Sequence, residues 1–249
     1  MNFLAFDTST EVMSIAVGKS GSGTATHGAA QQWLHTAAGG PQASSGLIAG
    51  VMDVLNQAGL ALTDLDAIAF GAGPGSFTGL RTACSVAQGL AFGANVPVLP
   101  MDTLLAVAEE ARHTAQADAD TLRVTALLDA RMDEMYAATY DYADGRWTEV
   151  QGSHLVRPEA FAAERARAAV ADSGNVLAGN VFAVYGERLG GLTGIAALPT
   201  AAAMLRMAPA LMAAGKAMPA EQALPSYIRD KVAKTTAERM AEKAALAAQ

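Results

Sequence analysis

The chain contains the same short arrangement of residues twice, and this repetition limits the folds that it can adopt. Residues 3–17 form an apolar run that ends at Asp7, a polar turn, and a second run with alternating apolar residues. Residues 124–140 repeat this order, with Asp129 at the end of the first run. Short apolar runs separated by turn residues predict strands. We interpret the repetition as an internal duplication of a strand–turn–strand unit; chance similarity of short apolar runs is the alternative.

Helical patterns alternate with the predicted strands. Apolar residues recur at helical spacing in residues 44–58, and a glycine follows directly after this stretch. Helices are also predicted over residues 78–92, 158–170 and 200–214. Alternation of strands and helices predicts an α/β fold in which helices cover mixed sheets.

Composition excludes several classes of protein. The chain has 17 basic and 24 acidic residues, a net charge of −7, which counts against a protein that binds nucleic acid on its own. Its one cysteine, Cys84, cannot form an internal disulfide, as expected in a reducing compartment. The sequence shows neither a signal-peptide pattern nor a run of about 18 apolar residues. We therefore expect a cytoplasmic protein that does not enter a membrane.

The glycines gather in one loop, Gly-Ala-Gly-Pro-Gly-Ser-Phe-Thr-Gly-Leu-Arg at residues 71–81. Such a loop lets the backbone approach another molecule closely, and Ser76 or Thr78 could cap the helix behind it, where anions bind. The loop matches neither a P-loop, nor a dinucleotide fingerprint, nor a nucleophile elbow. A tight turn without a ligand is the alternative. The candidate contacts for a nucleotide or a partner are Gly73, Pro74, Gly75, Ser76, Phe77, Thr78, Gly79 and Arg81.

Asp7, Thr8 and Ser9 form a candidate vestigial nucleotide pocket. A carboxylate at the end of a strand, beside two hydroxyls, could hold a magnesium–water cluster, or it could only cap the turn. The equivalent Asp129 has no glycine after it to cradle a phosphate, which counts against ATP hydrolysis. The four histidines show no paired helical spacing and there is one cysteine, so we expect no metal site.

These motifs together resemble the TsaB (YeaZ) family, whose members are subunits of the bacterial complex that makes threonylcarbamoyladenosine on tRNA. The resemblance lies on residues 3–17, 59–92 and 124–140, and on Leu-Pro-Ser-Tyr-Ile-Arg at 224–229. It spans roughly residues 1–232. The Gly-Pro-Gly-Ser-Phe-Thr-Gly-Leu-Arg string is its most specific part.

The resemblance implies an actin-like (ASKHA) α/β fold, with two duplicated RNase H-like lobes whose mixed sheets are flanked by helices. We expect a partner-binding N-terminal lobe at 1–100, a C-terminal lobe at 101–232 and an extra helical tail at 233–249. The implied role is that of a non-catalytic scaffold and activating subunit. Such a subunit pairs with the transferase TsaD, engages the small ATPase TsaE, pairs with itself when alone, and meets tRNA only through the complex. No cofactor is required, although ATP or ADP could bind weakly or be shared with the partner.

The family pairs through the helices that correspond here to residues 44–58 and 78–92. Small residues recur in the second helix, which indicates close packing against its own sheet, a partner, or both. The sequence departs from the family at Ala72, where an arginine is common, and at residues 42–45, which lack a histidine that many relatives keep. The candidate interface residues are Leu47, Val51, Leu55, Ala83, Ala87 and Leu90.

Two other functions stay open at this point. Asp7 and the glycine-rich loop would also suit an active ATPase or phosphotransferase of the same fold. A peptidase is the remote alternative, because no Ser-His-Asp arrangement is visible in the sequence.

Overall fold

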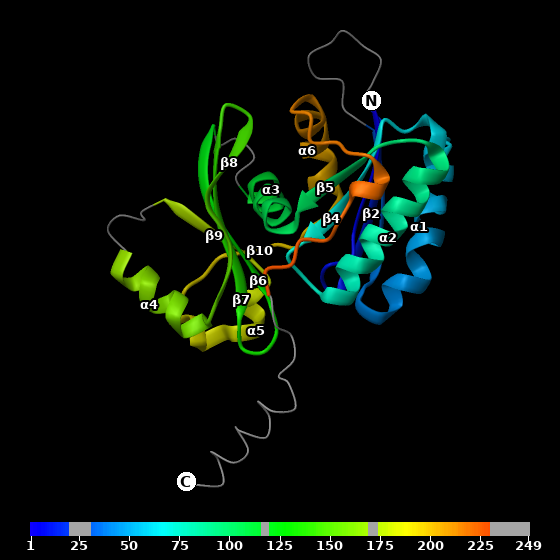
Figure 1. Ribbon diagram of the computed structural model, residues 1–249. Coiled ribbons are helices and arrows are strands. Elements are labelled where there is room, and N and C mark those ends of the chain that lie inside the picture. Colours follow the sequence, from blue (N-terminus) through cyan, green and yellow to red (C-terminus); the bar gives the residue numbers. More distant parts are fainter. Residues whose placement is uncertain (20–30, 116–119, 169–173, 230–249) are drawn as a thin grey trace, which may run out of the picture.

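The computed structural model describes residues 1–19, 31–115, 120–168 and 174–229, so the expected tail at 233–249 lies outside the described residues (Figure 1). The chain forms two five-stranded sheets, with strand orders β3-β2-β1-β4-β5 and β10-β9-β6-β7-β8. Within the described ranges, no helix is both long and apolar enough to cross a membrane.

The first sheet is built from the N-terminal part of the chain. Strand β1 pairs antiparallel with β2, so that Phe6 lies opposite Ile15, and parallel with β4, so that Ala5 lies opposite Ala69. Strand β3 forms one edge of the sheet. The strands are β1 (Asn2–Asp7), β2 (Val12–Lys19), β3 (Gln31–Ala38), β4 (Ala67–Gly73) and β5 (Val98–Asp102).

The second sheet repeats the pairing of the first. Strand β6 pairs antiparallel with β7 and parallel with β9, just as β1 pairs with β2 and β4. This correspondence confirms the duplicated strand–turn–strand unit and the two mixed sheets expected from the sequence. The strands are β6 (Thr121–Asp129), β7 (Met135–Ala143), β8 (Arg146–Val156), β9 (Asn175–Gly179) and β10 (Ile195–Ala196).

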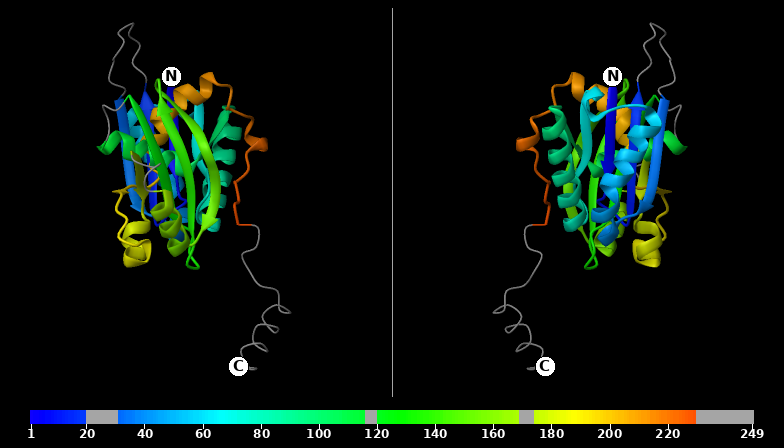
Figure 2. Two further views of the ribbon diagram at one scale, coloured as in Figure 1. Left: turned by 90° about the vertical axis from the view of Figure 1, so that its left-hand side faces the viewer. Right: turned by 90° about the vertical axis from the view of Figure 1, so that its right-hand side faces the viewer.

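Helices cover both faces of each sheet, and α3 (Thr103–Ala115) and α6 (Ala201–Ala213) lie between the sheets (Figures 1 and 2). Helices α1 and α2 pack on the outer face of the first sheet, and α4 and α5 on the outer face of the second. The helices are α1 (Ala43–Ala58), α2 (Phe77–Ala94), α3 (Thr103–Ala115), α4 (Pro158–Ala168), α5 (Val181–Tyr185) and α6 (Ala201–Ala213). Short 3-10 helices occupy η1 (Gly40–Gln42), η2 (Leu62–Asp64), η3 (Gly186–Leu189) and η4 (Ala220–Gln222).

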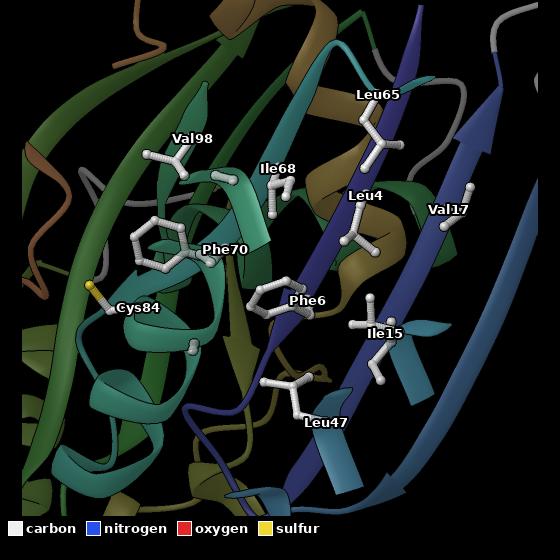
Figure 3. Close-up of a cluster of buried hydrophobic side chains, with 14 of the residues drawn as sticks. Leu4, Phe6, Ile15, Val17, Leu47, Leu65, Ile68, Phe70, Cys84 and Val98 are labelled. Carbon is white, nitrogen blue, oxygen red and sulfur yellow. The ribbon is translucent and has the colours of Figure 1, made fainter. Parts of the chain in front are cut away.

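The core under α1 and α2 explains why these helices form. Leu47 of α1 and Cys84 of α2 reach the same cluster as Phe6, Ile15 and Phe70 of the sheet (Figure 3). All five side chains are buried. Burial of apolar side chains at a helical period on a sheet surface is the main stabilising contribution here.

Each of the two central helices packs on the sheet that is formed by the other half of the chain. Helix α6 comes from the second half but packs on the first sheet, where Met204 lies in one cluster with Phe3 and Leu99. Helix α3 comes from the first half but packs on the second sheet, where Leu104 lies with Val124. A cut at residue 100, the expected boundary between the lobes, would therefore leave the first sheet without α6, and it would also fall within β5.

A buried ion cluster joins the central helices to the second sheet. Glu109 of α3, whose side chain is 3% exposed, accepts hydrogen bonds from Arg112 (2.9 Å), Trp147 of β8 (3.1 Å) and Arg206 of α6 (2.8 Å). Burial alone would raise the pKa of Glu109, but these hydrogen bonds hold it below its usual value. The cluster thus keeps a charged carboxylate at the junction of the two lobes.

Candidate functional site

A cavity of about 450 Å³ lies between the two lobes. Each lobe contributes the turn that follows its first strand: residues 9–11 after β1 and residues 128–132 around the end of β6. The glycine-rich loop before α2 and the C-terminal segment 226–229 complete the wall. A cleft of this kind, where two duplicated units meet, is the default place to look for a binding site.

Asp7 is fully buried at the end of β1 and does not line this cavity. Its Oδ1 atom accepts hydrogen bonds from the backbone N–H (2.9 Å) and the hydroxyl (2.7 Å) of Ser9. Its Oδ2 atom has no hydrogen-bond partner in the described part of the chain. Instead Oδ2 lies against Gly71 of β4, because a Cβ atom built there would overlap it. Burial raises the pKa of Asp7 to about 7, although the hydrogen bonds from Ser9 lower it.

The glycine-rich loop packs directly on the turn between β1 and β2. The Ser76 N–H donates to the carbonyl oxygen of Ser9 (2.8 Å), and the Thr8 hydroxyl donates to the carbonyl oxygen of Gly79 (2.7 Å). A Cβ atom at Gly75 would lie 2.6 Å from Cβ of Ser9, and one at Gly79 would overlap the Thr8 carbonyl. The glycines therefore let the loop pack closely against the turn between β1 and β2.

Some of the remaining loop residues bond to other parts of the chain, and others line the cavity. Ser76 occupies the N-cap position of α2, but its side chain makes no capping hydrogen bond, and Thr78 lies within the helix. The backbone N–H of Ser226 donates to the carbonyl oxygen of Ala72 (2.7 Å), and the Thr103 hydroxyl donates to that of Pro74. Of the sequence-predicted loop residues, those that line the cavity are Pro74, Gly75, Ser76 and Phe77.

An aromatic pair stands at the mouth of the cavity. The rings of Phe77 and Tyr227 lie 5.2 Å apart, and the guanidinium of Arg81 lies over the Phe77 ring at 5.0 Å. Phe77 is 48% exposed and Tyr227 46%. Sequence reasoning did not select Tyr227 as a site residue, because the C-terminal segment meets this loop only in the folded chain.

The turn between β6 and β7 has an unusual backbone. Arg131, Met132 and Asp133 have φ angles of 60°, 56° and 61°, a left-handed conformation that costs residues other than glycine on the order of 1 kcal/mol each. Asp129 holds this turn through the Arg131 side chain (3.0 Å) and the Tyr185 hydroxyl (2.7 Å). The pKa of Tyr185 is raised, mainly by burial and next by the hydrogen bond to the Asp129 carboxylate. The turn presents Arg131 and Met132 at the cavity.

The candidate interface residues need correction. Leu47, Val51, Leu55, Ala83 and Ala87 are buried in the core of the first lobe, and Leu90 is half-buried. The helical periodicity that selected them marks the face turned toward the sheet. The outer side of the same helices carries Ile48 (52% exposed), Met52 (50%) and Phe92 (79%), together with Gly89 and Gly93.

The described histidines are not part of the site. His35 lies on β3, His113 near the end of α3 and His154 on β8, and none of these three lines the cavity. The fourth, His27, lies outside the described residues. Among the described residues, no group of three or more histidine, cysteine, aspartate or glutamate side chains could hold a metal ion.

Comparison with known proteins gives consistent matches over most of the chain. The family model of TsaD, tRNA N6-adenosine threonylcarbamoyltransferase, matches residues 29–237. The tRNA threonylcarbamoyladenosine biosynthesis protein TsaB of Escherichia coli is 35% identical over 237 residues, which cover 94% of this chain and 96% of the relative. The protein of the same name from Haemophilus influenzae is 37% identical over 167 residues, 64% of this chain and 65% of the relative. The solved structure of YeaZ from Pseudomonas aeruginosa superposes with a TM-score of 0.73 at 37% identity, covering 91% of this chain and 99% of that one.

Proposed function

Because the chain belongs to the TsaB (YeaZ) family, with its two-lobed actin-like fold and its role in tRNA threonylcarbamoyladenosine biosynthesis, we propose that it is a non-catalytic activating subunit in this pathway. In this role it pairs with a TsaD-type transferase and engages a TsaE-type ATPase. The complex then attaches the threonylcarbamoyl group to N6 of the adenosine next to the tRNA anticodon.

The packing of Asp7 is the observation that carries the non-catalytic part of the proposal. An actin-like phosphotransferase needs a carboxylate and a glycine-rich loop that are open to magnesium and phosphate. Here the free oxygen of Asp7 lies against Gly71, and the Ser76 N–H is bonded to Ser9. The Ser76 N–H, which could receive a nucleotide phosphate, is instead bonded to the chain itself, so its use would require the loop and the turn to separate.

The outer side of α1 and α2 supports the partner proposal. Ile48, Met52 and Phe92 expose apolar surface there, and such surface on a soluble protein often marks a site of association. Gly89 and Gly93 lie one helical turn apart on α2, and a Cβ atom at either position would meet nothing within 4 Å. A helical glycine costs about 1 kcal/mol relative to alanine, and intramolecular packing does not require one here. Close approach of a partner helix would explain both glycines.

The partner in this proposal is the TsaD-type paralogue, and a second copy of the chain takes its place when the chain is alone. No cofactor of its own is required. Any ATP or ADP would bind weakly or be shared with the partner.

Reconstitution tests the proposal directly. Purified transferase, ATPase, ATP, an activated threonylcarbamoyl donor and unmodified tRNA should yield threonylcarbamoyladenosine only when this chain is added, and the chain alone should hydrolyse no ATP. Efficient modification without the chain would contradict the proposal.

An ATPase or phosphotransferase is the second candidate, favoured by the position of Asp7 at the end of β1 beside an interlobe cavity. Calorimetry with Mg-ATP separates the two functions. Tight binding that is lost in Asp7→Ala would favour the phosphotransferase.

A further inference from the structure

A strip of exposed side chains crosses the mouth of the cavity from one lobe to the other. Its two α2 members lie in the first turns of that helix, whereas the proposed pairing uses Gly89, Phe92 and Gly93 near the helix end. We call this set the rim strip; its members are Arg81, Phe77, Tyr227, Met132 and Arg131. We propose that the rim strip binds an unpaired nucleotide of RNA, with its base on the aromatic side chains and its phosphates at the arginines. The proposal rests on the proposed function in that tRNA is the RNA to be bound, and it differs from the expectation from the sequence that the chain meets tRNA only through the complex.

Phe77, Tyr227, Arg131 and Met132 line the same cavity. Arg81 lies over Phe77 at 5.0 Å, and Phe77 lies 5.2 Å from Tyr227. The same C-terminal segment continues to Arg229, whose guanidinium contacts the sulfur of Met132 at 3.0 Å. Side chains from α2, the C-terminal segment and the β6–β7 turn therefore form one surface.

Exposure of these large side chains is not required by the fold. Phe77 and Tyr227 are each about half-exposed, at 48% and 46%, and Met132 is 67% exposed. Three such side chains around one cavity form an apolar surface of the kind that marks a binding site. Aromatic faces of this type stack well with nucleic-acid bases, whatever the base.

Arginines stand at both ends of the aromatic surface. Arg81 is exposed, and the Arg131 side chain is 76% exposed although it pairs with Asp129. The Asp129 side chain is 6% exposed, but it also accepts hydrogen bonds from the Arg131 N–H and the Tyr185 hydroxyl, so the carboxylate keeps two partners when the Arg131 side chain turns to a phosphate. Glu11 is the exposed carboxylate on the same wall. The overall charge of −7 keeps non-specific RNA binding weak, so that binding at the strip can be detected against a low background.

The strip is held in place before any ligand arrives. Ser226, next to Tyr227, is bonded to the carbonyl of Ala72 (2.7 Å), and Arg229 pairs with Glu134 (2.6 Å). These two bonds anchor the C-terminal segment to both lobes on either side of Tyr227. A surface that is already ordered binds at lower entropic cost.

The geometry favours an RNA strand over a free Mg-nucleotide. The deeper position, where a triphosphate would lie beside Asp7, is filled by the contact between the glycine-rich loop and the β1–β2 turn. The rim strip lies outside this contact and is open, so a strand can cross it without entering the fold.

Photo-crosslinking with the full-length chain alone tests this inference. The probe is a short single-stranded RNA that carries 4-thiouridine; the comparison ligands are its duplex form and Mg-ATP. Mass spectrometry should place the cross-links on the rim strip. In titrations with labelled RNA, Tyr227→Ala should weaken binding about tenfold. Arg81→Gln should reduce the slope of log affinity against log salt by roughly 0.7.

Matched controls remove other exposed side chains that lie away from the strip. Leu34→Ala on β3 and Arg146→Gln on β8 should leave the RNA affinity unchanged. The inference is overturned by the absence of cross-links at the strip, by equal losses in the controls, or by Mg-ATP binding at Tyr227 in place of RNA. No partner protein is present in this assay, so a failed reconstitution and a failed RNA contact are separate results.

Discussion

Asp7 Oδ2 lies directly against the α-carbon of Gly71, so closely that a Cβ atom there would overlap it. This contact joins β1 to β4 at the point where an actin-like enzyme would expose a carboxylate. Four predictions test this contact, the two outer helices and the connection between the lobes.

Gly71→Ala should strongly destabilise the protein. The new methyl group would overlap Asp7 Oδ2 and lie 3.1 Å from the Thr103 methyl, and overpacking of a core costs about 1–3 kcal/mol or more. Gly89→Ala is the matched control, because its Cβ enters open space and the helix should gain up to about 1 kcal/mol. Urea denaturation measures both. Equal stability of the two variants would show that Asp7 is not confined.

The contribution of Asp7 to stability should fall as the pH rises from about 4 to about 7. Burial raises the pKa of Asp7 from 3.8 to about 7, so the folded state binds the proton more tightly than the unfolded chain does. The resulting stabilisation is complete below the unfolded pKa and is lost as the pH passes the folded one. At about 1.4 kcal/mol per pKa unit, this contribution reaches up to about 4 kcal/mol.

The difference in unfolding free energy between the wild type and Asp7→Asn isolates this contribution. Asparagine does not titrate, so the wild type should lose unfolding free energy relative to Asp7→Asn as the pH rises from about 4 to about 7. Parallel pH profiles of the two proteins would rule the contribution out.

Two arginine substitutions on α2 should have opposite consequences. Ala87→Arg places a charge in the core of the first lobe, where Ala87 is 0% exposed, and should abolish folding. Gly89→Arg, two residues later, points outward and should leave the fold intact while blocking pairing with the TsaD-type partner. Circular dichroism and co-elution distinguish the two effects. Normal pairing by Gly89→Arg would move the interface away from this face.

A fragment of residues 1–100 should not fold on its own. It lacks α6, which covers the face of the first sheet formed by Phe3, Ala69 and Leu99. Heteronuclear NMR spectra of the fragment should show collapsed, poorly dispersed signals. A cooperative unfolding transition in the fragment would contradict this account of the central helices.

The sequence was informative where local pattern decides the structure. The duplicated strands and the bounds of α1 and α2 follow from apolar periodicity, and the observed helices extend the predicted ranges by at most two residues at either end. The same periodicity misled the choice of interface residues. It identifies the face of a helix that is buried, as at Leu47 and Ala87, and cannot say what covers the opposite face.

The rest depends on contacts between residues far apart in the sequence. Arg206 and Glu109 are 97 residues apart, and Ser226 meets Ala72 across most of the chain. The glycine-rich loop is another example. The glycine pattern predicts that the backbone approaches another group closely, but only the folded chain shows that this group is the Thr8–Ser9 turn.

The most direct test of the central claim is threonylcarbamoylation of tRNA by the TsaD-type transferase and its ATPase, with this chain supplied as wild type, Asp7→Asn or Gly89→Arg. If the chain acts as a non-catalytic partner, Asp7→Asn should support modification at the wild-type rate and Gly89→Arg should not. Loss of modification with a folded, partner-bound Asp7→Asn chain would contradict the account and would assign Asp7 a chemical role.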